Sequence, residues 1–198
     1  MSCSTPRKLK RPSTRPADVG SADGFEILAS EPAVELGFLR VDRVDVRVPD
    51  GSVVERIAVR HPGAVAVLPI DGDDVILIRQ YRAPLAAALL EVPAGKLDVV
   101  GEPAETTAVR ELEEEIGMRP GRLRAVGGFF TTPGFTDEHI ELFVAEELEA
   151  VPYAPHGPEE EAAEIVRMPI ADVPALLSGG GVTDVKTVVA LQWLLLNR

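Results

Sequence analysis

Three glutamates placed one helical turn apart constrain this chain more than any other feature of its sequence. A helix is predicted over Pro103–Ile116, and on it Glu111, Glu114 and Glu115 fall at positions i, i+3 and i+4 of one face. Like charges at that spacing destabilise an isolated helix, and Arg110 is the only cation in this stretch. Converging carboxylates are hard oxygen ligands of the kind that Mg²⁺ or Mn²⁺ prefers. The spacing therefore indicates a divalent-cation site, with a solvated acidic helix face as the alternative.

The overall charge narrows the class of partner. The chain has 198 residues, with 20 Lys and Arg against 32 Asp and Glu, and a formal net charge of -12. Such a chain repels bare nucleic acid and anionic membranes, but bound divalent ions invert the local field and attract a phosphate-bearing small molecule. The sequence has one cysteine, no apolar run long enough for a membrane span and no signal-peptide core, so we expect a cytoplasmic protein.

The distribution of residue types predicts a basic tail followed by one domain. Residues 1–24 are rich in Ser, Pro, Gly and cations, and are expected to be disordered; residues 25–198 are expected to form the domain. The first half of the domain contains short β-type runs, including a hairpin around the turn at 71–73, and two helices are expected near the end, over 170–177 and 185–196, the second capped by Thr183. This mixture indicates the α/β class.

The flanks of the acidic helix make its pattern specific. Glu102 is followed after seven residues by Arg110-Glu111-Leu112, and then by Glu114-Glu115 and Gly117-Met118, each after one residue. This segment resembles the Nudix box, except that six residues rather than five separate Gly95 from Glu102. The resemblance implies a Nudix fold, which is an α/β/α sandwich with a mixed central sheet, here with additional N-terminal antiparallel strands. It also implies hydrolysis of a diphosphate linked to another group.

The resemblance also implies a role for each matching residue. Glu111 and Glu115 correspond to the principal metal ligands, Glu114 to a further ligand or a base, and the backbone carbonyl of Ala94 to another ligand. Arg110 would orient a ligand carboxylate through charge-assisted hydrogen bonds. Two or three divalent ions, Mg²⁺ or possibly Mn²⁺, would be bound together with the substrate.

Two features outside the box are similar to the ADP-ribose pyrophosphatases of this family. Pro133 lies 16 residues after Gly117, a distance typical of that subfamily, although an ordinary Pro-Gly turn is the alternative. Arg82 ends the strand segment Gln80-Tyr81-Arg82, which resembles a substrate-binding Q-x-R, and Arg79 is the second candidate for this contact. Either arginine could instead be the partner in a surface ion pair.

An acidic loop over 156–164 is the third feature of that kind. In the subfamily, a mobile loop here supplies a glutamate that activates water. Glu161 is the first candidate, with Glu160 and Glu164 as alternatives, and a solvated charged loop is the simplest other interpretation.

The resemblance further implies a homodimer in which the strands of residues 25–60 take part. Phe38 could then stack on the adenine of a shared site, or it could be a core residue of the first strand. The expected reaction is Mg²⁺-dependent hydrolysis of ADP-ribose to AMP and ribose 5-phosphate. The alternatives are another nucleotide sugar or dinucleotide, such as GDP-mannose, NADH or a diadenosine polyphosphate, or a catalytically silent module that senses a nucleotide.

Overall fold

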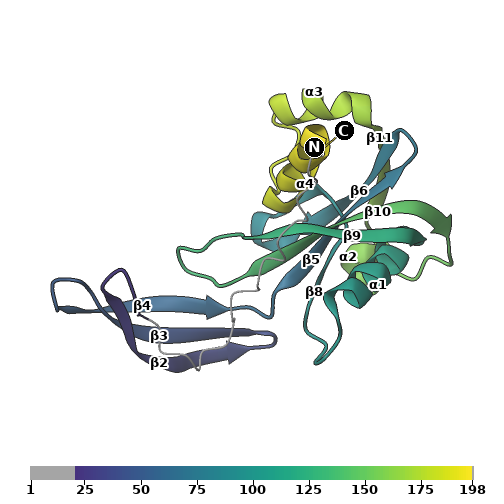
Figure 1. The fold of residues 1–198 in the computed structure, drawn as a ribbon. Coiled ribbons are helices and arrows are strands. Elements are labelled where there is room, and N and C mark those ends of the chain that lie inside the picture. The colour runs from purple at the N-terminus through teal and green to yellow at the C-terminus, as the bar shows by residue number, and fades with distance from the viewer. Residues whose placement is uncertain (1–20, 198) are drawn as a thin grey trace, which may run out of the picture. The chain divides into compact units, whose positions relative to one another are not determined.

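A computed structural model describes residues 21–197, and their contacts form two compact units (Figure 1). Unit 1 contains the described residues up to His61 together with Thr132–Asp137, and unit 2 contains Pro62–Thr131 and the described residues from Glu138 onward. Most of the predicted disordered tail, residues 1–20, lies outside the described residues, whereas its last four residues form a short strand and a turn. No helix among the described residues is long and apolar enough to cross a membrane.

Unit 1 is a four-stranded antiparallel sheet in the order β1-β2-β3-β4. Its strands are β1 (Ser21–Ala22), β2 (Phe25–Leu36), β3 (Leu39–Arg47) and β4 (Val53–Arg60). The segment Thr132–Asp137 runs beside the end of β4, where the Val59 N–H donates to the Phe135 carbonyl at 2.7 Å. The strands expected within residues 25–60 therefore form a sheet of their own.

Unit 2 is built on a mixed sheet of seven strands. Five of them follow the order β11-β6-β5-β10-β9, with β7 paired to β6 and β8 paired to β5, and only the β10–β5 pair is parallel. Its strands are β5 (Ala64–Asp71), β6 (Asp74–Arg82), β7 (Ala87–Glu91), β8 (Ala94–Lys96), β9 (Met118–Phe130), β10 (His139–Ala150) and β11 (Glu164–Pro169). Its helices are α1 (Ala104–Ile116), α2 (Pro158–Glu161), α3 (Val173–Ser178) and α4 (Val185–Asn197), with the 3-10 turns Ala83–Leu85 and Ile170–Asp172.

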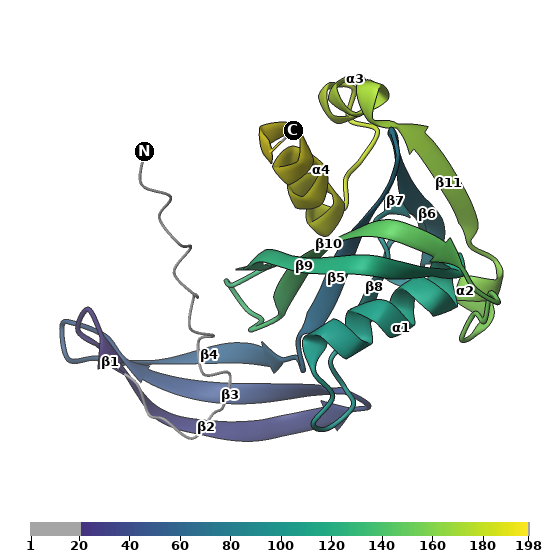
Figure 2. The ribbon, with the colours of Figure 1, turned by 45° about the vertical axis from the view of Figure 1, so that its right-hand side comes forward.

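Helices cover both faces of this sheet, which makes unit 2 the predicted α/β/α sandwich (Figures 1 and 2). Alternate residues of β5 belong to two separate cores, because successive side chains of a strand point to opposite faces. Ala66 and Leu68 pack in the core under α4, and Val65 and Val67 pack in the core under α1. A continuous apolar strand covered on both sides explains why this run shows no alternation in the sequence.

Two predicted helix boundaries differ slightly from the structure. The acidic helix begins at Ala104, with Pro103 as the residue before it. The last helix is capped by Asp184 rather than Thr183, because the Asp184 carboxylate accepts a hydrogen bond from the Thr187 N–H at 3.0 Å. An aspartate cap satisfies a free N–H of the first turn and adds a charge that the helix dipole favours.

Candidate active site

The acidic helix α1 is anchored to the sheet by one apolar side. Leu112 is fully buried and Ile116 almost so, in the core that lies between α1 and the sheet. Gly117 ends the helix with a positive φ of 63°, a conformation that glycine adopts without strain. The packing of these apolar residues determines which way the remaining faces of the helix point, and it brings Glu111 and Glu115 to the edge of the core, with 7% and 4% of their surfaces exposed.

The short strand β8 lies directly against these two carboxylates. The Ala94 N–H donates to Oε2 of Glu115 at 2.9 Å. A Cβ atom at Gly95 would come within 1.9 Å of the Glu111 carboxyl group, far inside any real contact distance. A glycine is therefore required at residue 95, since any side chain there would displace Glu111.

Arg110 connects the other acidic residues of the box. Its Nη1 atom lies 2.8 Å from Glu114 Oε2 and 2.9 Å from Glu111 Oε1, and its Nη2 atom lies 3.7 Å from Glu102 Oε2. Glu102 also accepts a hydrogen bond from the Thr107 hydroxyl at 2.7 Å. These bonds orient the carboxylates of Glu111 and Glu114, which is the role expected of Arg110.

Glu111 and Glu115 have too little positive charge nearby to balance their own negative charges. Burial, together with the charges of Glu114 and Glu160, raises the pKa of Glu111 to about 7 against the pull of Arg110. Burial, with the charges of Glu111 and Glu160, raises the pKa of Glu115 to about 8 in spite of the Ala94 hydrogen bond. Protonation is one way to relieve such repulsion, and a bound cation is the other.

The donor set fits a divalent cation. Within residues 21–197, no three His, Cys, Asp or Glu side chains already surround one point, and Arg110 engages Glu114. The two buried carboxylates Glu111 and Glu115 would thus hold Mg²⁺, together with backbone oxygen from the adjoining β8 and water. Mg²⁺ is commonly bound in this way, by one or two carboxylates plus water and substrate phosphate.

Arg82 lies beside this cluster on the α1 face of the sheet. Its guanidinium forms two hydrogen bonds with the fully buried Glu91, from Nε at 2.8 Å and from Nη2 at 2.7 Å. The bonds to Glu91 raise the pKa of Arg82, and Glu115 contributes to that rise through its charge. Arg82 is thus a cation that faces the carboxylates of α1.

Sequence reasoning missed Glu91 and its second partner, Lys186 of α4. Both are buried, and the Lys186 ammonium forms an ion pair with Glu91 and another with Asp184 at 3.0 Å. A signal was present, because each is a charged residue inside an apolar run. Such residues are seldom fully buried unless they are paired.

Arg79 lies on the other face of β6 from Arg82, because the two are three positions apart and successive side chains of a strand alternate between its faces. It forms an ion pair with Glu164 at 3.5 Å, in register across β6 and β11. Arg79 thus has the surface ion-pair contact that was its alternative, and its partner is Glu164, one of the alternative glutamates for activating water.

The acidic loop supplies one glutamate whose charge acts on the cluster. Glu160, in the short helix α2, raises the pKa of both Glu111 and Glu115, and its carboxylate accepts a hydrogen bond from the His156 N–H at 2.6 Å. Burial raises the pKa of Tyr153, and the charges of Glu160, Glu115 and Glu161, the first candidate from the sequence, add to that rise.

Two other candidate residues belong to unit 1. Phe38 lies in the turn between β2 and β3, where 46% of its surface is exposed and its ring contacts His61 edge-on at 5.3 Å. It is therefore not a core residue. Pro133 is exposed in the segment beside β4, and that segment is fixed by Asp137, whose carboxylate accepts a hydrogen bond from the His61 N–H at 2.8 Å.

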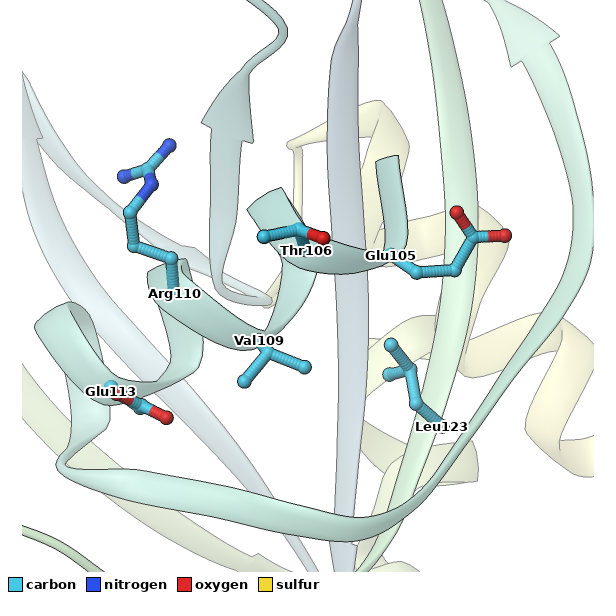
Figure 3. A pocket seen from close by; sticks show the side chains of 6 residues that line it. All are labelled: Glu105, Thr106, Val109, Arg110, Glu113 and Leu123. Atoms are coloured by element: carbon cyan, nitrogen blue, oxygen red, sulfur yellow. The ribbon is translucent and has the colours of Figure 1, made fainter. Parts of the chain in front are cut away.

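A cavity of about 580 Å³ lies between α1 and β9 and is lined by neither Glu111 nor Glu115 (Figure 3). Val109 and Leu123 point toward one another there, while Arg110 points to the other side of the helix. The lining residues are Glu105, Thr106, Val109, Arg110, Glu113 and Leu123. Because neither Glu111 nor Glu115 lines it, we do not assign the chemistry to this cavity.

Fold and site together define a class of protein: an α/β sandwich with a helix of cation-binding carboxylates on one face and an arginine beside them. Comparison with known proteins makes the class specific. A profile of the NUDIX domain matches residues 60–188, and the chain belongs to this family.

Individual relatives agree with this assignment. The chain is 42% identical to an ADP-ribose pyrophosphatase of Bacillus subtilis (strain 168), over 78% of this chain and 83% of that protein. It is 40% identical to a methanol dehydrogenase activator of Bacillus methanolicus, over 81% of this chain and 85% of that protein. A solved structure described as an ADP compounds hydrolase superposes with a TM-score of 0.76 at 28% identity, covering 88% of this chain and 96% of that one.

Proposed function

We propose that this chain is a Mg²⁺-dependent hydrolase that cleaves the diphosphate of ADP-ribose, with water, into AMP and ribose 5-phosphate. The observation that carries the proposal is the pair of buried carboxylates, Glu111 and Glu115, with pKa values raised to about 7 and about 8. The name of the Bacillus subtilis relative supports ADP-ribose as the substrate.

Each side chain of the site would have its own role in the reaction. Glu111 and Glu115 would hold the metal, and Arg110 orients Glu111 and Glu114 through the bonds described above. When bound, divalent ions supply charge neutralisation at the diphosphate and a more acidic attacking water. Arg82 presents its guanidinium from the end of β6, beside these carboxylates, and this suits it to bind an oxygen of the substrate diphosphate.

A glutamate of the acidic loop would take a proton from the attacking water. Glu160 is favoured by its charge interaction with Glu111 and Glu115, and Glu161 and Glu114 are the other candidates. Replacing each in turn by Gln distinguishes them, because loss of the base lowers kcat and removes the acidic limb of the pH profile, in which activity rises as the base loses its proton, while metal affinity is retained.

Product analysis tests the reaction itself. We expect AMP and ribose 5-phosphate in equal amounts from ADP-ribose and Mg²⁺, and almost none from a Glu115→Gln variant. Turnover by the unaltered chain no greater than that of the variant would refute the proposal. Hydrolysis in ¹⁸O-labelled water identifies which phosphorus is attacked.

A substrate panel tests the choice of substrate. Values of kcat/KM for ADP-ribose, GDP-mannose, NADH and a diadenosine polyphosphate rank the alternatives, because discrimination lies in that ratio. A preference for one of the others would leave the reaction type intact and change the substrate. The silent-module alternative is less favoured, since every carboxylate of the box is present.

We further propose a cytoplasmic homodimer whose contact involves unit 1. Its sheet exposes large apolar side chains, and this supports a partner surface. The exposed residues of the strands and turn are Phe25, Val34, Leu36, Phe38, Val53 and Ile57. Light scattering of the purified chain measures the oligomeric state, and a monomer at micromolar concentration would contradict the proposal.

A further inference from the structure

Four charged side chains form a row that ends beside the proposed metal ligands. Asp184 pairs with Lys186 at 3.0 Å, Lys186 pairs with Glu91, and Glu91 forms two hydrogen bonds with Arg82. Their charges alternate along the row. Two members, Glu91 and Lys186, are separated by 95 residues in the chain and are both buried.

Glu91 engages only one side of the Arg82 guanidinium. The two bonds use Nε and Nη2, and neither uses Nη1. A guanidinium has five N–H donors, so three of them are not used by Glu91. The side chain of Arg82 is 39% exposed, whereas that of Glu91 is 1% exposed. Arg82 is thus held from its buried side and can still donate to an oxyanion.

Lys186 matters because Glu91 would otherwise neutralise Arg82. A buried carboxylate paired with one guanidinium cancels most of its charge toward a ligand. With Lys186 on its other side, Glu91 shares its negative charge between two cations. Burial acts to raise the pKa of Glu91, but the hydrogen bonds and charges of Arg82 and Lys186 outweigh it and lower that pKa. The carboxylate therefore stays ionised and continues to accept both bonds.

We propose that Glu91 and Lys186 are positioning residues, which hold the Arg82 guanidinium and keep its positive charge available to a diphosphate bound at the carboxylates of α1. This inference rests on the proposed function only in its choice of ligand. Glu91 fixes the position of the Arg82 guanidinium, and Lys186 balances part of the negative charge of Glu91.

A neighbouring contact joins the same parts of the fold without belonging to the row of charges. Thr187, the next residue of α4, joins the same helix to the same strand end: its hydroxyl accepts a hydrogen bond from the Val92 N–H at 2.8 Å and donates to Asp184 at 2.6 Å. No hydrogen bond among residues 21–197 links its side chain to Arg82 or Glu91. Thr187→Val is therefore a matched control that weakens this junction while leaving the charges in place.

The first experiment removes the charge of Lys186. Lys186→Met keeps most of the side-chain volume, and we expect about tenfold weaker binding of α,β-methylene-ADP with Mg²⁺ by calorimetry, since one charged contact of this kind accounts for about that factor. KM for ADP-ribose should rise by a similar factor while kcat changes by less than about threefold. Lys186→Arg should retain the affinity, and the controls Thr187→Val and Arg167→Met, the latter at a surface ion pair with Asp71, should not alter it.

The double variant Glu91→Gln/Lys186→Met separates charge balance from structural support. It removes both buried charges, which proteins commonly tolerate, and the Gln amide oxygen can still accept from Arg82. We expect its affinity to return to within about threefold of the unaltered chain, a non-additive recovery. A double variant that binds as weakly as Lys186→Met, or more weakly, would overturn the charge-balance role. If Lys186→Met does not fold, the affinity of the double variant is compared with those of Lys186→Arg and of the unaltered chain.

The role of Glu91 has a test that needs no ligand. The Nε–H of a guanidinium held by a carboxylate exchanges slowly with water and gives a resolved NMR signal, here assigned by its loss in Arg82→Lys. We expect the signal to persist in Lys186→Met and to disappear in Glu91→Leu. Its persistence in Glu91→Leu would show that Glu91 does not hold Arg82.

The two proposals fail differently. If the unaltered chain binds α,β-methylene-ADP but does not hydrolyse ADP-ribose, the proposed substrate is wrong and the Arg82 inference is judged on binding and NMR. If it hydrolyses ADP-ribose but the Lys186 and Glu91 variants keep normal KM, affinity and NMR signal, the inference is wrong and the proposed function stands.

Discussion

Two buried carboxylates, Asp42 of unit 1 and Glu115 of unit 2, have opposite electrostatic surroundings. Asp42 is fully buried and accepts hydrogen bonds from Arg40 at 2.8 and 3.1 Å, Arg60 at 2.9 Å and Ser30 at 3.0 Å. Burial alone would raise its pKa, but these bonds outweigh it and lower that pKa.

Glu115 is equally enclosed and has far less support. Only the Ala94 N–H donates to it among the hydrogen bonds of residues 21–197, while Glu111 and Glu160 repel it. A buried charge that is fully hydrogen-bonded stabilises the fold around it, and one that is not creates a demand for a ligand. The difference supports a structural role for Asp42 and the proposed metal-binding role for Glu115.

The largest expected effect is the loss of activity in Glu115→Gln. Removal of a metal-binding carboxylate should lower kcat by about a thousandfold or more. The folded state should be retained, because the amide is nearly isosteric and removes a repelled charge. Steady-state kinetics and thermal unfolding measure the two effects, with Glu113→Gln, on the far side of α1 and paired with Arg119, as control. A variant with normal kcat would remove the distinction between the two carboxylates.

Gly95→Ala should reduce activity by about a hundredfold. The new Cβ would collide with the Glu111 carboxyl group, so that this carboxylate moves away from Glu115. Displacements of about 1 Å at a catalytic group have effects of this size. Gly72 lies at a positive φ of 62°, and a Cβ atom added there would have no heavy atom within 4 Å. Gly72→Ala therefore controls for backbone strain and should lower stability without lowering kcat. Equal activity losses in both variants would contradict the close-approach argument.

Asp42→Asn should lower the free energy of unfolding by about 2 kcal/mol, because the variant leaves Arg40 and Arg60 without an anionic partner. Urea denaturation measures the change, and Asp45→Asn on the exposed side of the same strand serves as control. The folded variant should keep kcat within about twofold. A loss of activity larger than the loss of stability would assign Asp42 a functional role and weaken the contrast with Glu115.

The pH dependence of stability should show the smallest effect of the difference between Asp42 and Glu115. Glu115 has a folded-state pKa of about 8, above its unfolded value near 4.5, so its contribution to stability is complete at low pH and is lost as pH rises through about 8. Asp42 has a lowered pKa, so its contribution is lost as pH falls. With chelator present, stability should therefore decline as pH rises from about 4.5 to about 8, and Glu115→Gln should flatten that decline.

Magnesium should reverse this decline. Metal binding displaces a proton from Glu115 below about pH 8 and another from Glu111 below about pH 7, so apparent affinity should increase about tenfold per pH unit between pH 7 and 8 and more steeply below pH 7. Calorimetric titration with Mg²⁺ between pH 6 and 9 measures this, and an affinity independent of pH would contradict the raised pKa values.

The local part of the site could be predicted because it depends on one helix. The spacing of Glu111, Glu114 and Glu115 places them on one face of any helix, and the flanking residues identify the box. The resemblance to the box implied that Arg110 would orient a ligand carboxylate, and in the structure it lies 2.8 and 2.9 Å from Glu114 and Glu111.

The remaining parts depended on contacts between distant segments. Arg82 was the first candidate from the sequence and Arg79 the second, and the register of β6 with β11 pairs Arg79 with Glu164 on the other face of the sheet. Glu160 and Glu161 are adjacent in the sequence, and only their placement in the short helix α2 shows that the charge of Glu160 acts on both Glu111 and Glu115.

The sequence by itself therefore determined the family, the α/β class and the carboxylates of α1, since helical periodicity converts spacing directly into geometry. Only the tertiary structure decided which buried charges are compensated. Asp42, Glu91 and Glu115 are all acids within apolar surroundings, and pairing across the sheet gives cations to the first two and withholds them from the third. Electrostatic energy depends on distance through space, which separation along the chain does not specify.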